Sequence, residues 1–372
     1  MRIEAVHPRE LGASDVVAWE NLRSANGSLT SPYYSGAFAR LMGEVRPDAR
    51  VAVLMDGAAT VGYLGVQGIS RFAALGLGTP LSDYQGLVAE QRLIFDHRDL
   101  CRALRVGRVD LVNVPLDQSA FAGALQGAQA SWVADLSMGP LAYLERMRER
   151  RQETVRQQDR KRRKLMREHP DVVFQACSNS REHLTALLEW KTDQCRRTGQ
   201  PLVWATPWVR EVVYRSFDSQ DASFGGALFT MTRGDTLVAA HYLLRSGSVL
   251  HAWLIGHDGG FEAYSPGVLL TRFLVEWAAN NGFVEVDFGI GDYRYKREFA
   301  EPLRQLGWGT IGQPSWSLAL RSAQYQARAI LERAPVEKVA SAPGKLMRRV
   351  DVLRGLAAPA MAGRLPIKEH AS

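Results

Sequence analysis

The chain has 372 residues, of which 46% are hydrophobic and 23% charged, which is ordinary for a globular protein with room for two domains. No apolar run approaches the roughly 20 residues of a membrane-spanning helix, and residues 1–20 lack the apolar stretch of a signal peptide. The cysteines Cys101, Cys177 and Cys195 form no zinc or redox motif. We therefore expect a cytoplasmic protein with reduced thiols and no metal site.

The net charge of +7 is concentrated in two segments. Residues 144–169 carry eleven Arg or Lys and five Asp or Glu, and residues 321–372 carry ten and four. The rest of the chain is mildly acidic. Such basic segments suit phosphates, nucleic acid or an anionic membrane surface, so peripheral contact with the inner membrane is one expectation.

Two β-hairpins are predicted about half a chain apart, at 51–66 with an Asp-Gly turn and at 227–244 with an Arg-Gly-Asp turn. When Gly57 is aligned with Gly234, Val61 falls on Val238. This spacing favours two tandem, related α/β domains. The second half then reads as helices, a hairpin, and a strand–helix–strand unit, which is a mixed α/β pattern.

A helix rich in arginine is predicted between the two halves, from Pro140 to its stop at Pro170. Its apolar positions are sparse, so one face is expected to be solvated. The predicted organisation is a first domain over 1–137, a basic linking helix over 138–170, a second domain over 171–320 and a basic tail over 321–372.

A phosphate-binding helix start is predicted after the strand 249–256. Ser265 can cap the helix, Pro266 suits its first turn and Gly267 allows a close backbone approach. Free N–H groups at a helix N-terminus attract anions. The two interpretations are a pyrophosphate cradle for a nucleotide-type cofactor and an ordinary capped helix.

The stretch "VDFGIGDYRYKREF" (286–299) concentrates glycine, tyrosine and charge at a strand end. Asp287 is either a turn cap or a base or substrate ligand, and Lys296 is available for an anionic group. His241 is either a core residue or a base. Lys191 either points into a cleft or extends along the surface, and Trp204 either lies in the core or lines a sugar-binding cleft.

The segments "GDTLVAAHYLL", "LHAWLIGHD" and "AYSPGVLLTRFLVEWAANNGFVEVDFGIGDYRYKREF" resemble the GNAT-superfamily acyltransferases of the cellulose-biosynthesis (CelD-like) type, which are related to the Fem-type peptidyltransferases. The resemblance covers residues 140–315 well and 20–135 loosely. It implies two tandem GNAT-like domains with mixed, mostly antiparallel sheets flanked by helices. It also implies an acyl-CoA donor, acetyl-CoA first, without a metal.

The resemblance carries over to particular residues. Asp287, Tyr295 and Lys296 match the motif that faces the acceptor cleft. Lys191 and Trp204 are further candidate acceptor contacts on their residue types, outside the resemblance. The usual GNAT phosphate loop, (Gln/Arg)-x-x-Gly-x-(Gly/Ala), is absent. Five residues match the pyrophosphate-binding segment: Tyr264, Ser265, Pro266, Gly267 and Val268.

The expected function is transfer of an acyl group to an amine or hydroxyl of a bacterial surface glycan or its precursor, such as cellulose, capsule or a holdfast-like adhesin. The acceptor would be a polysaccharide, a nucleotide sugar or a lipid-linked sugar. Asp287 or His241 would act as the base, and Lys296 would position an anionic acceptor. Two alternatives are a non-catalytic regulatory module that responds to cyclic di-GMP in polysaccharide export, and Fem-type aminoacyl transfer from tRNA.

Overall fold

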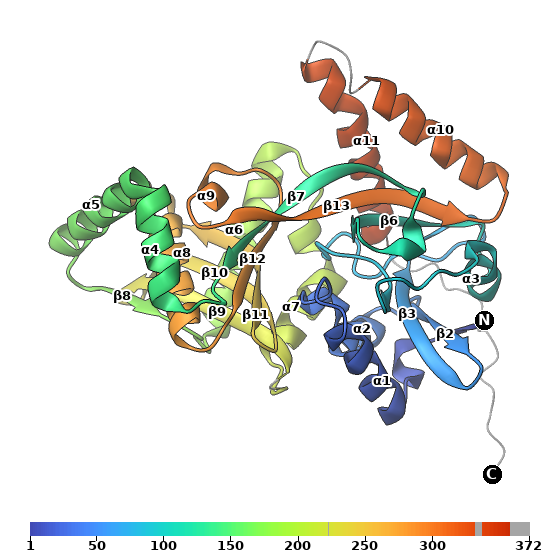
Figure 1. Cartoon of the computed structure of the whole chain (residues 1–372). Helices are drawn as coiled ribbons and strands as arrows, with labels where there is room; N and C mark the ends of the chain where they lie inside the picture. The colour runs from blue at the N-terminus through green and yellow to red at the C-terminus, as the bar shows by residue number, and fades with distance from the viewer. Residues whose placement is uncertain (222, 332–336, 358–372) are drawn as a thin grey trace.

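The computed structural model describes residues 1–221, 223–331 and 337–357. Two α/β halves lie side by side and are connected by two long strands (Figure 1). Within the described residues, one continuous 13-stranded sheet runs through both halves, in the order β1-β2-β3-β4-β6-β13-β7-β12-β11-β10-β9-β8, with β5 paired to β3. The predicted mixed, mostly antiparallel sheet flanked by helices is confirmed.

The first half places α3 against one face of its strands and α1 and α2 against the other, which gives two apolar clusters. Its elements are β1 (Arg2–Val6), α1 (Ala13–Ser24), α2 (Gly36–Val45), β2 (Arg50–Asp56), β3 (Ala59–Gln67), β4 (Ala74–Gly76), β5 (Val88–Ala89), α3 (His97–Leu104) and β6 (Arg108–Pro115).

The second half places α8 against one face of its strands and α6 with α7 against the other. Its elements are β8 (Val172–Gln175), α6 (Arg181–Thr198), α7 (Pro207–Phe217), β9 (Phe224–Arg233), β10 (Thr236–Ser246), β11 (Val249–His257), α8 (Pro266–Asn280), β12 (Glu285–Ile290) and the short α9 (Arg294–Arg297).

The two halves exchange strands. β7 (Leu125–Asp135) continues from the first half but pairs with β12 of the second, whereas β13 (Glu301–Gly312) continues from the second half and pairs with β6 of the first. The two exchanged strands also pair with each other. The sheet therefore has no break at the junction, and side chains from both halves meet there.

Both predicted hairpins are present and antiparallel, as β2–β3 and β9–β10. Gly57 and Gly234 occupy the turns with φ of 60° and 53°, a left-handed conformation that glycine adopts without steric cost. The local sequence therefore predicted these two β-hairpins correctly.

The arginine-rich segment forms two helices rather than the single predicted one, α4 (Pro140–Arg150) and α5 (Gln152–Glu168). Arg151, with φ −139° and ψ 39°, separates them. Its guanidinium turns inward and donates to the Ala300 carbonyl oxygen at 2.8 Å and to Glu301 at 2.7 Å. This tertiary contact overrides the helical propensity of the segment.

Beyond β13, the described residues form α10 (Trp316–Leu331) and α11 (Glu337–Leu356), which cover the first half in Figure 1. Asp110 of β6 holds both helices, because Arg354 lies 3.0 Å and Arg321 3.5 Å from its carboxylate. Arg46 donates to the carbonyl oxygens of Gly355 and Ala357, at 3.1 Å each. The boundaries at 137, 170 and 320 remain predictions.

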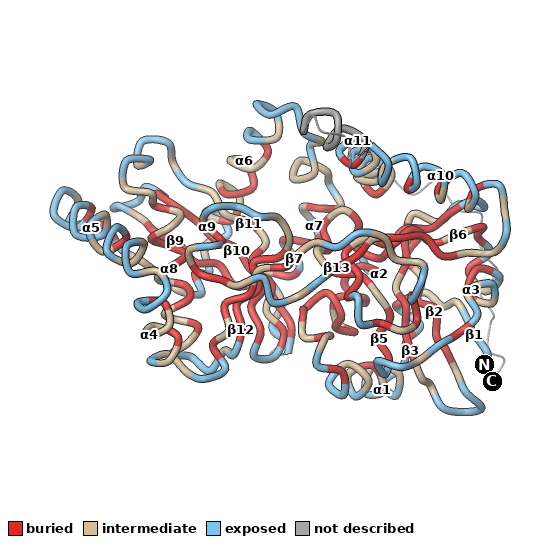
Figure 2. Tube along the Cα trace, turned by 45° about the horizontal axis from the view of Figure 1, so that its top comes forward, coloured by how far each residue is buried: buried red, intermediate tan, exposed pale blue. Residues whose placement is uncertain are grey.

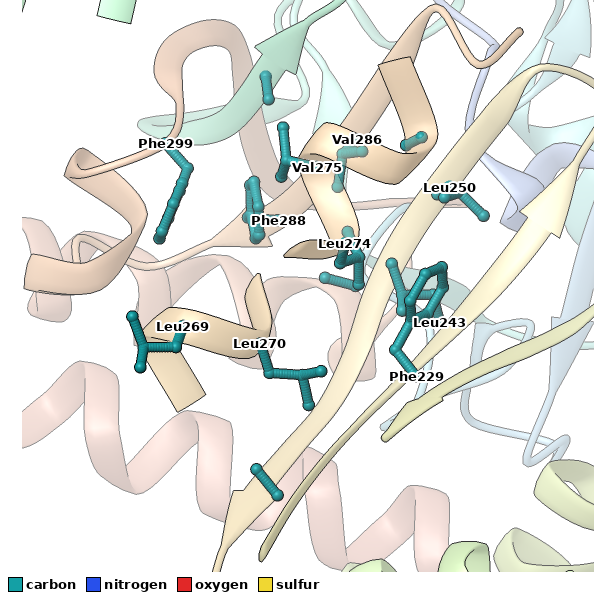
Figure 3. Close-up of a cluster of buried hydrophobic side chains, with 14 of the residues drawn as sticks. Phe229, Leu243, Leu250, Leu269, Leu270, Leu274, Val275, Val286, Phe288 and Phe299 are labelled. Carbon is teal, nitrogen blue, oxygen red and sulfur yellow. The ribbon is translucent and has the colours of Figure 1, made fainter. Parts of the chain in front are cut away.

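The core of the second half lies between α8 and the sheet, where Leu270 and Leu274 meet Phe229, Leu250 and Val286 (Figure 3). Figure 2 shows buried strands running through both halves, while α5 and α10 present exposed outer surfaces. Each leucine-to-alanine change in such a core costs about 2–5 kcal/mol, so α8 holds β11 and β12 in fixed positions.

Candidate active site

The site lies where β11 and β12 diverge. These parallel strands pair from Val249 and Glu285 as far as His251 and Asp287, and no pairing follows. On its other side β11 pairs with β10, where a register shift leaves Trp253 as an extra residue, a β-bulge. The divergence opens the sheet at one point, directly beyond the His251–Asp287 pair.

Asp287 is fully buried and bound on every side. Its Oδ2 accepts from the Tyr84 hydroxyl at 2.6 Å and from Arg304 at 2.9 Å, and its Oδ1 accepts from Ser131 at 3.2 Å and from the Gly289 amide at 2.7 Å. Burial favours the neutral acid, but His251 and Arg304 outweigh it and hold the pKa of Asp287 well below its usual range.

His251 lies between two carboxylates. Its Nε2 is 3.0 Å from Oδ2 of Asp83, and its Nδ1 is 3.6 Å from Oδ2 of Asp287. The imidazole is fully buried, which lowers its pKa, but the two carboxylates outweigh burial and raise the pKa to about 9. At neutral pH His251 is therefore an imidazolium. Of the three side chains, only Asp83 is accessible to solvent, with 31% of its side chain exposed.

Arg304 of β13 links the centre to the first half. It forms a bidentate pair with Glu285, both contacts at 2.6 Å, and also donates to Thr30 at 2.8 Å. Burial raises the pKa of Glu285, and the nearby Asp287 adds to this. The planar guanidinium thus fixes Asp287 through charge-assisted bonds.

Lys296 and Tyr295 lie close to this centre. The Lys296 ammonium is buried, donates to the Ile290 carbonyl oxygen and lies 5.3 Å from the centre of the Tyr293 ring. Burial lowers its pKa, and Asp83 and Asp287 oppose that effect. Burial raises the pKa of Tyr295, as does the charge of Asp83.

The N-terminus of α8 differs from the prediction in one respect. Ser265 occupies the cap position, but its φ of 53° is left-handed and its side chain makes no capping bond. Its hydroxyl instead accepts from Lys161 of α5 at 2.5 Å, and Lys164 lies 5.2 Å from the centre of the Tyr264 ring. The basic helix thus brings cations to the helix start, which strengthens its attraction for an anion.

The remaining predicted residues of this segment are Tyr264, Pro266, Gly267 and Val268. The Tyr264 hydroxyl bonds Glu168 at 2.7 Å, Pro266 is buried, and Val268 packs against the core. A Cβ on Gly267 would lie 3.5 Å from Ile255 of β11. Ile255 is four residues beyond His251, so about 13 Å of extended strand separates the helix start from the charged centre.

Three predicted residues lie elsewhere. His241 is buried on β10, its Nδ1 has no hydrogen-bond partner, and burial lowers its pKa to about 3, with Lys191 adding to the effect. Lys191 donates to Gln194 of its own helix at 2.5 Å. Trp204 packs edge-on against Trp253, with ring centres 6.2 Å apart. No hydrogen bond or ion pair among the described residues joins His241 or Lys191 to Asp287.

Sequence reasoning missed His251, Asp83, Tyr84 and Arg304, which complete the centre. It also missed Tyr33, whose ring lies 4.9 Å from that of His251 and whose buried hydroxyl has no hydrogen-bond partner. The sequence did contain a signal for His251. It lies on β11, the strand before α8, and β12 follows α8, so parallel pairing of the two strands places His251 opposite Asp287. Asp83 and Tyr84 lie in an irregular loop some 200 residues before Asp287, where the sequence offers no comparable signal.

Comparison with known families identifies the second half. Residues 153–297 match the model of the acetyltransferase (GNAT) domain. They contain the diverging strands and α8 with the Lys161 contact. The chain therefore carries a GNAT acetyltransferase domain and is an acyltransferase, and such a domain implies an acyl-CoA donor. Comparison with curated proteins gives no match.

Three solved structures align with most of the chain. FemX aligns with a TM-score of 0.51 at 11% identity, over 87% of this chain and 99% of that one. The C-terminal domain of a putative lysylphosphatidylglycerol synthetase from Agrobacterium fabrum aligns at 0.49 and 11%, over 84% and 96%. A tandem GNAT protein from the clavulanic acid pathway aligns at 0.47 and 14%, over 84% and 99%.

Two features are absent from the described residues. None of the helices in 1–221, 223–331 and 337–357 has both the length and the apolar character needed to span a bilayer. Over the same part of the chain, no group of three or more His, Cys, Asp or Glu side chains is arranged to hold a metal ion.

Proposed function

We propose that the chain transfers an acyl group from acyl-CoA, acetyl-CoA first, to an amine or hydroxyl of a bacterial surface glycan or its precursor, as a relative of the CelD-like acyltransferases. The observation that supports this proposal most directly is the Asp83–His251 pair at the point where β11 and β12 diverge. It places an accessible carboxylate and a titratable imidazole beside the opened sheet edge.

The donor is proposed to lie along the divergence. Its pyrophosphate would meet the α8 N-terminus and Lys161, and its extended arm would cover the about 13 Å to the charged centre. Beyond His251, the β11 backbone has no partner on β12, so N–H groups on that edge are available to a carbonyl oxygen.

The Asp83–His251 pair is proposed as the proton acceptor. Asp83 faces the acceptor, and Asp287, itself held by Arg304, orients His251, which accepts a proton in its neutral form. As the acceptor nitrogen bonds to the acyl carbon, the pair takes its proton. The C–S bond breaks, and the pair returns the proton to the leaving thiolate. The products are an amide and a free thiol.

The test is to measure thiol release from acetyl-CoA with amine and amino-sugar acceptors. Asp83→Asn should lower kcat by about 10²–10⁴-fold, the usual contribution of a general base, while the acetyl-CoA dissociation constant is unchanged. Asp235→Asn, in the exposed turn of the β9–β10 hairpin, is the control. Unaltered turnover of Asp83→Asn would remove the pair from the reaction.

One observation favours a second candidate, aminoacyl transfer from tRNA. Four exposed arginines of α5, spaced at one helical face, lie on the helix that carries Lys161: Arg156, Arg160, Arg163 and Arg167. A polyanionic donor would engage this row, and its affinity would fall steeply with salt. Filter binding of aminoacyl-tRNA between 50 and 200 mM salt tests this, and a flat response excludes it. Cyclic di-GMP and the inner-membrane surface remain predicted partners.

A further inference from the structure

A cavity of about 160 Å³ opens directly beside Asp83. It is much larger than the roughly 10–15 Å³ that one water requires. Asp83 and Ile290 line it next to the charged centre, Gln129 and Trp308 line it from the exchanged strands, and Arg348 and Asp351 line it from α11. The cavity therefore lies between Asp83 and the C-terminal helices.

The helical wall of this cavity is firmly attached. Arg321 pairs with both Asp351 and Asp110, and Arg354 pairs with Asp110 at 3.0 Å. A Cβ on Gly355 would collide with the carbonyl group of Thr79, which shows how closely α11 approaches the loop that carries Asp83. Helices α10 and α11 thus form a fixed part of the site.

Groups of opposite charge line the cavity: the carboxylate of Asp83 beside the charged centre and the guanidinium of Arg348 on α11, where the neighbouring Asp351 is paired with Arg321. Asp83 uses Oδ2 for His251, and its Oδ1 has no hydrogen-bond partner among the described residues. Arg348 is exposed and makes no hydrogen bond or ion pair with any described residue. A ligand that carries an amine at one end and an anion at the other would match both groups.

Resting on the proposed acyltransferase function, we propose that this cavity is the acceptor site and that the acceptor is an amine bearing a phosphate or carboxylate. The amine would pair with Asp83 and the anionic group with Arg348. Arg348 is then a specificity-determining residue, supplied by a helix outside the residues that match the GNAT domain. Guanidinium groups bind such oxyanions through charge-assisted hydrogen bonds.

The experiment compares two matched pairs of acceptors: O-phosphoethanolamine with ethanolamine, and glucosamine 6-phosphate with glucosamine. Arg348→Gln should raise KM for each phosphorylated amine about tenfold, and leave KM for each neutral parent and kcat nearly unchanged. The control is Arg349→Gln, which removes an exposed arginine next in sequence that does not line the cavity. It should behave as the wild type.

Calorimetric binding of O-phosphoethanolamine and glucosamine 6-phosphate gives a readout that is independent of turnover. Binding that is lost in Arg348→Gln but kept in Arg349→Gln supports the anion-binding site, even if no acetyl-CoA is consumed and the donor chemistry fails. The inference is overturned if the wild type binds neither probe, or if all three proteins bind them equally while acetyl-CoA turnover proceeds.

Discussion

The Nε2 atom of His251 lies 3.0 Å from Oδ2 of Asp83, and the two residues come from opposite halves of the chain. His251 belongs to β11 of the second half, whereas Asp83 belongs to a loop of the first. β7 and β13 join the halves into one sheet, and Trp253 of β11 donates to the Leu81 carbonyl oxygen of the loop that carries Asp83. A domain with GNAT architecture thus takes its accessible carboxylate from its neighbour.

The pH dependence of turnover should report on His251. Its pKa of about 9 means that the proton-accepting form predominates only above that pH, so kcat/KM should rise with pH up to about 9. Asp287→Asn removes a carboxylate that stabilises the imidazolium, so the midpoint should fall by about one pH unit or more.

The acceptor's own ammonium group also titrates in this range, but it is the same for both enzymes. The shift between wild type and Asp287→Asn, measured with one acceptor, therefore carries the test. If the midpoint of the pH dependence of kcat/KM were the same in both enzymes, the protonation of His251 would not control turnover.

Gly289→Ala should abolish most turnover. Gly289 has φ of 69°, and a Cβ there would collide with the Asp83 carboxylate and lie 3.4 Å from Nε2 of His251. The matched control is Gly282→Ala, because Gly282 has φ of 79° but an added Cβ meets nothing within 4 Å. Both variants incur similar backbone strain, about 1–2 kcal/mol.

The readout is kcat for each variant together with the free energy of unfolding. Loss of turnover in Gly289→Ala alone, at comparable stability, would show that the position of Asp83 matters for the reaction. Equal activities in the two variants would contradict the proposed role of Asp83.

The sequence predicted elements whose signals are local. The hairpin turns at Gly57 and Gly234 follow from adjacent residues, and the strand–helix–strand unit around α8 follows from its apolar periodicity. Strand exchange had no such signal, because the alternation of polar and apolar residues along β7 and β13 is compatible with any neighbouring strand.

The site residues also divide into those with a local sequence signal and those without one. Asp287 and Lys296 were found because they share one short, unusual motif, and the structure places both near Asp83. The sequence singled out His241, in the apolar strand that follows the second hairpin turn, and gave His251 no role. Their environments differ through tertiary contacts: His251 lies within 4 Å of two carboxylates, whereas the burial of His241 and the positive charge of Lys191 both lower its pKa.

Lys161→Ala should weaken donor binding. Lys161 holds Ser265 at the start of α8, so its loss should raise KM for acetyl-CoA about tenfold with little change in kcat. Acetyl-pantetheine lacks the pyrophosphate, so its KM should be unaffected. Arg162→Ala removes an exposed neighbouring cation and serves as the control. Equal effects on the two donors would argue against a phosphate site here.

The two buried histidines should give stability opposite dependences on pH. His251 has a folded-state pKa of about 9, above the roughly 6.5 of an unfolded chain, so its contribution is complete below pH 6.5 and is lost as pH rises through 9. That loss amounts to about 3 kcal/mol.

His241, with a pKa of about 3, acts in the other direction, because the unfolded chain gains a proton as pH falls below 6.5 and the folded chain does not. Urea unfolding from pH 4 to 10 measures both effects. His251→Gln should remove the alkaline loss and His241→Gln the acid one; a His251→Gln variant that keeps the alkaline loss would assign it to another group.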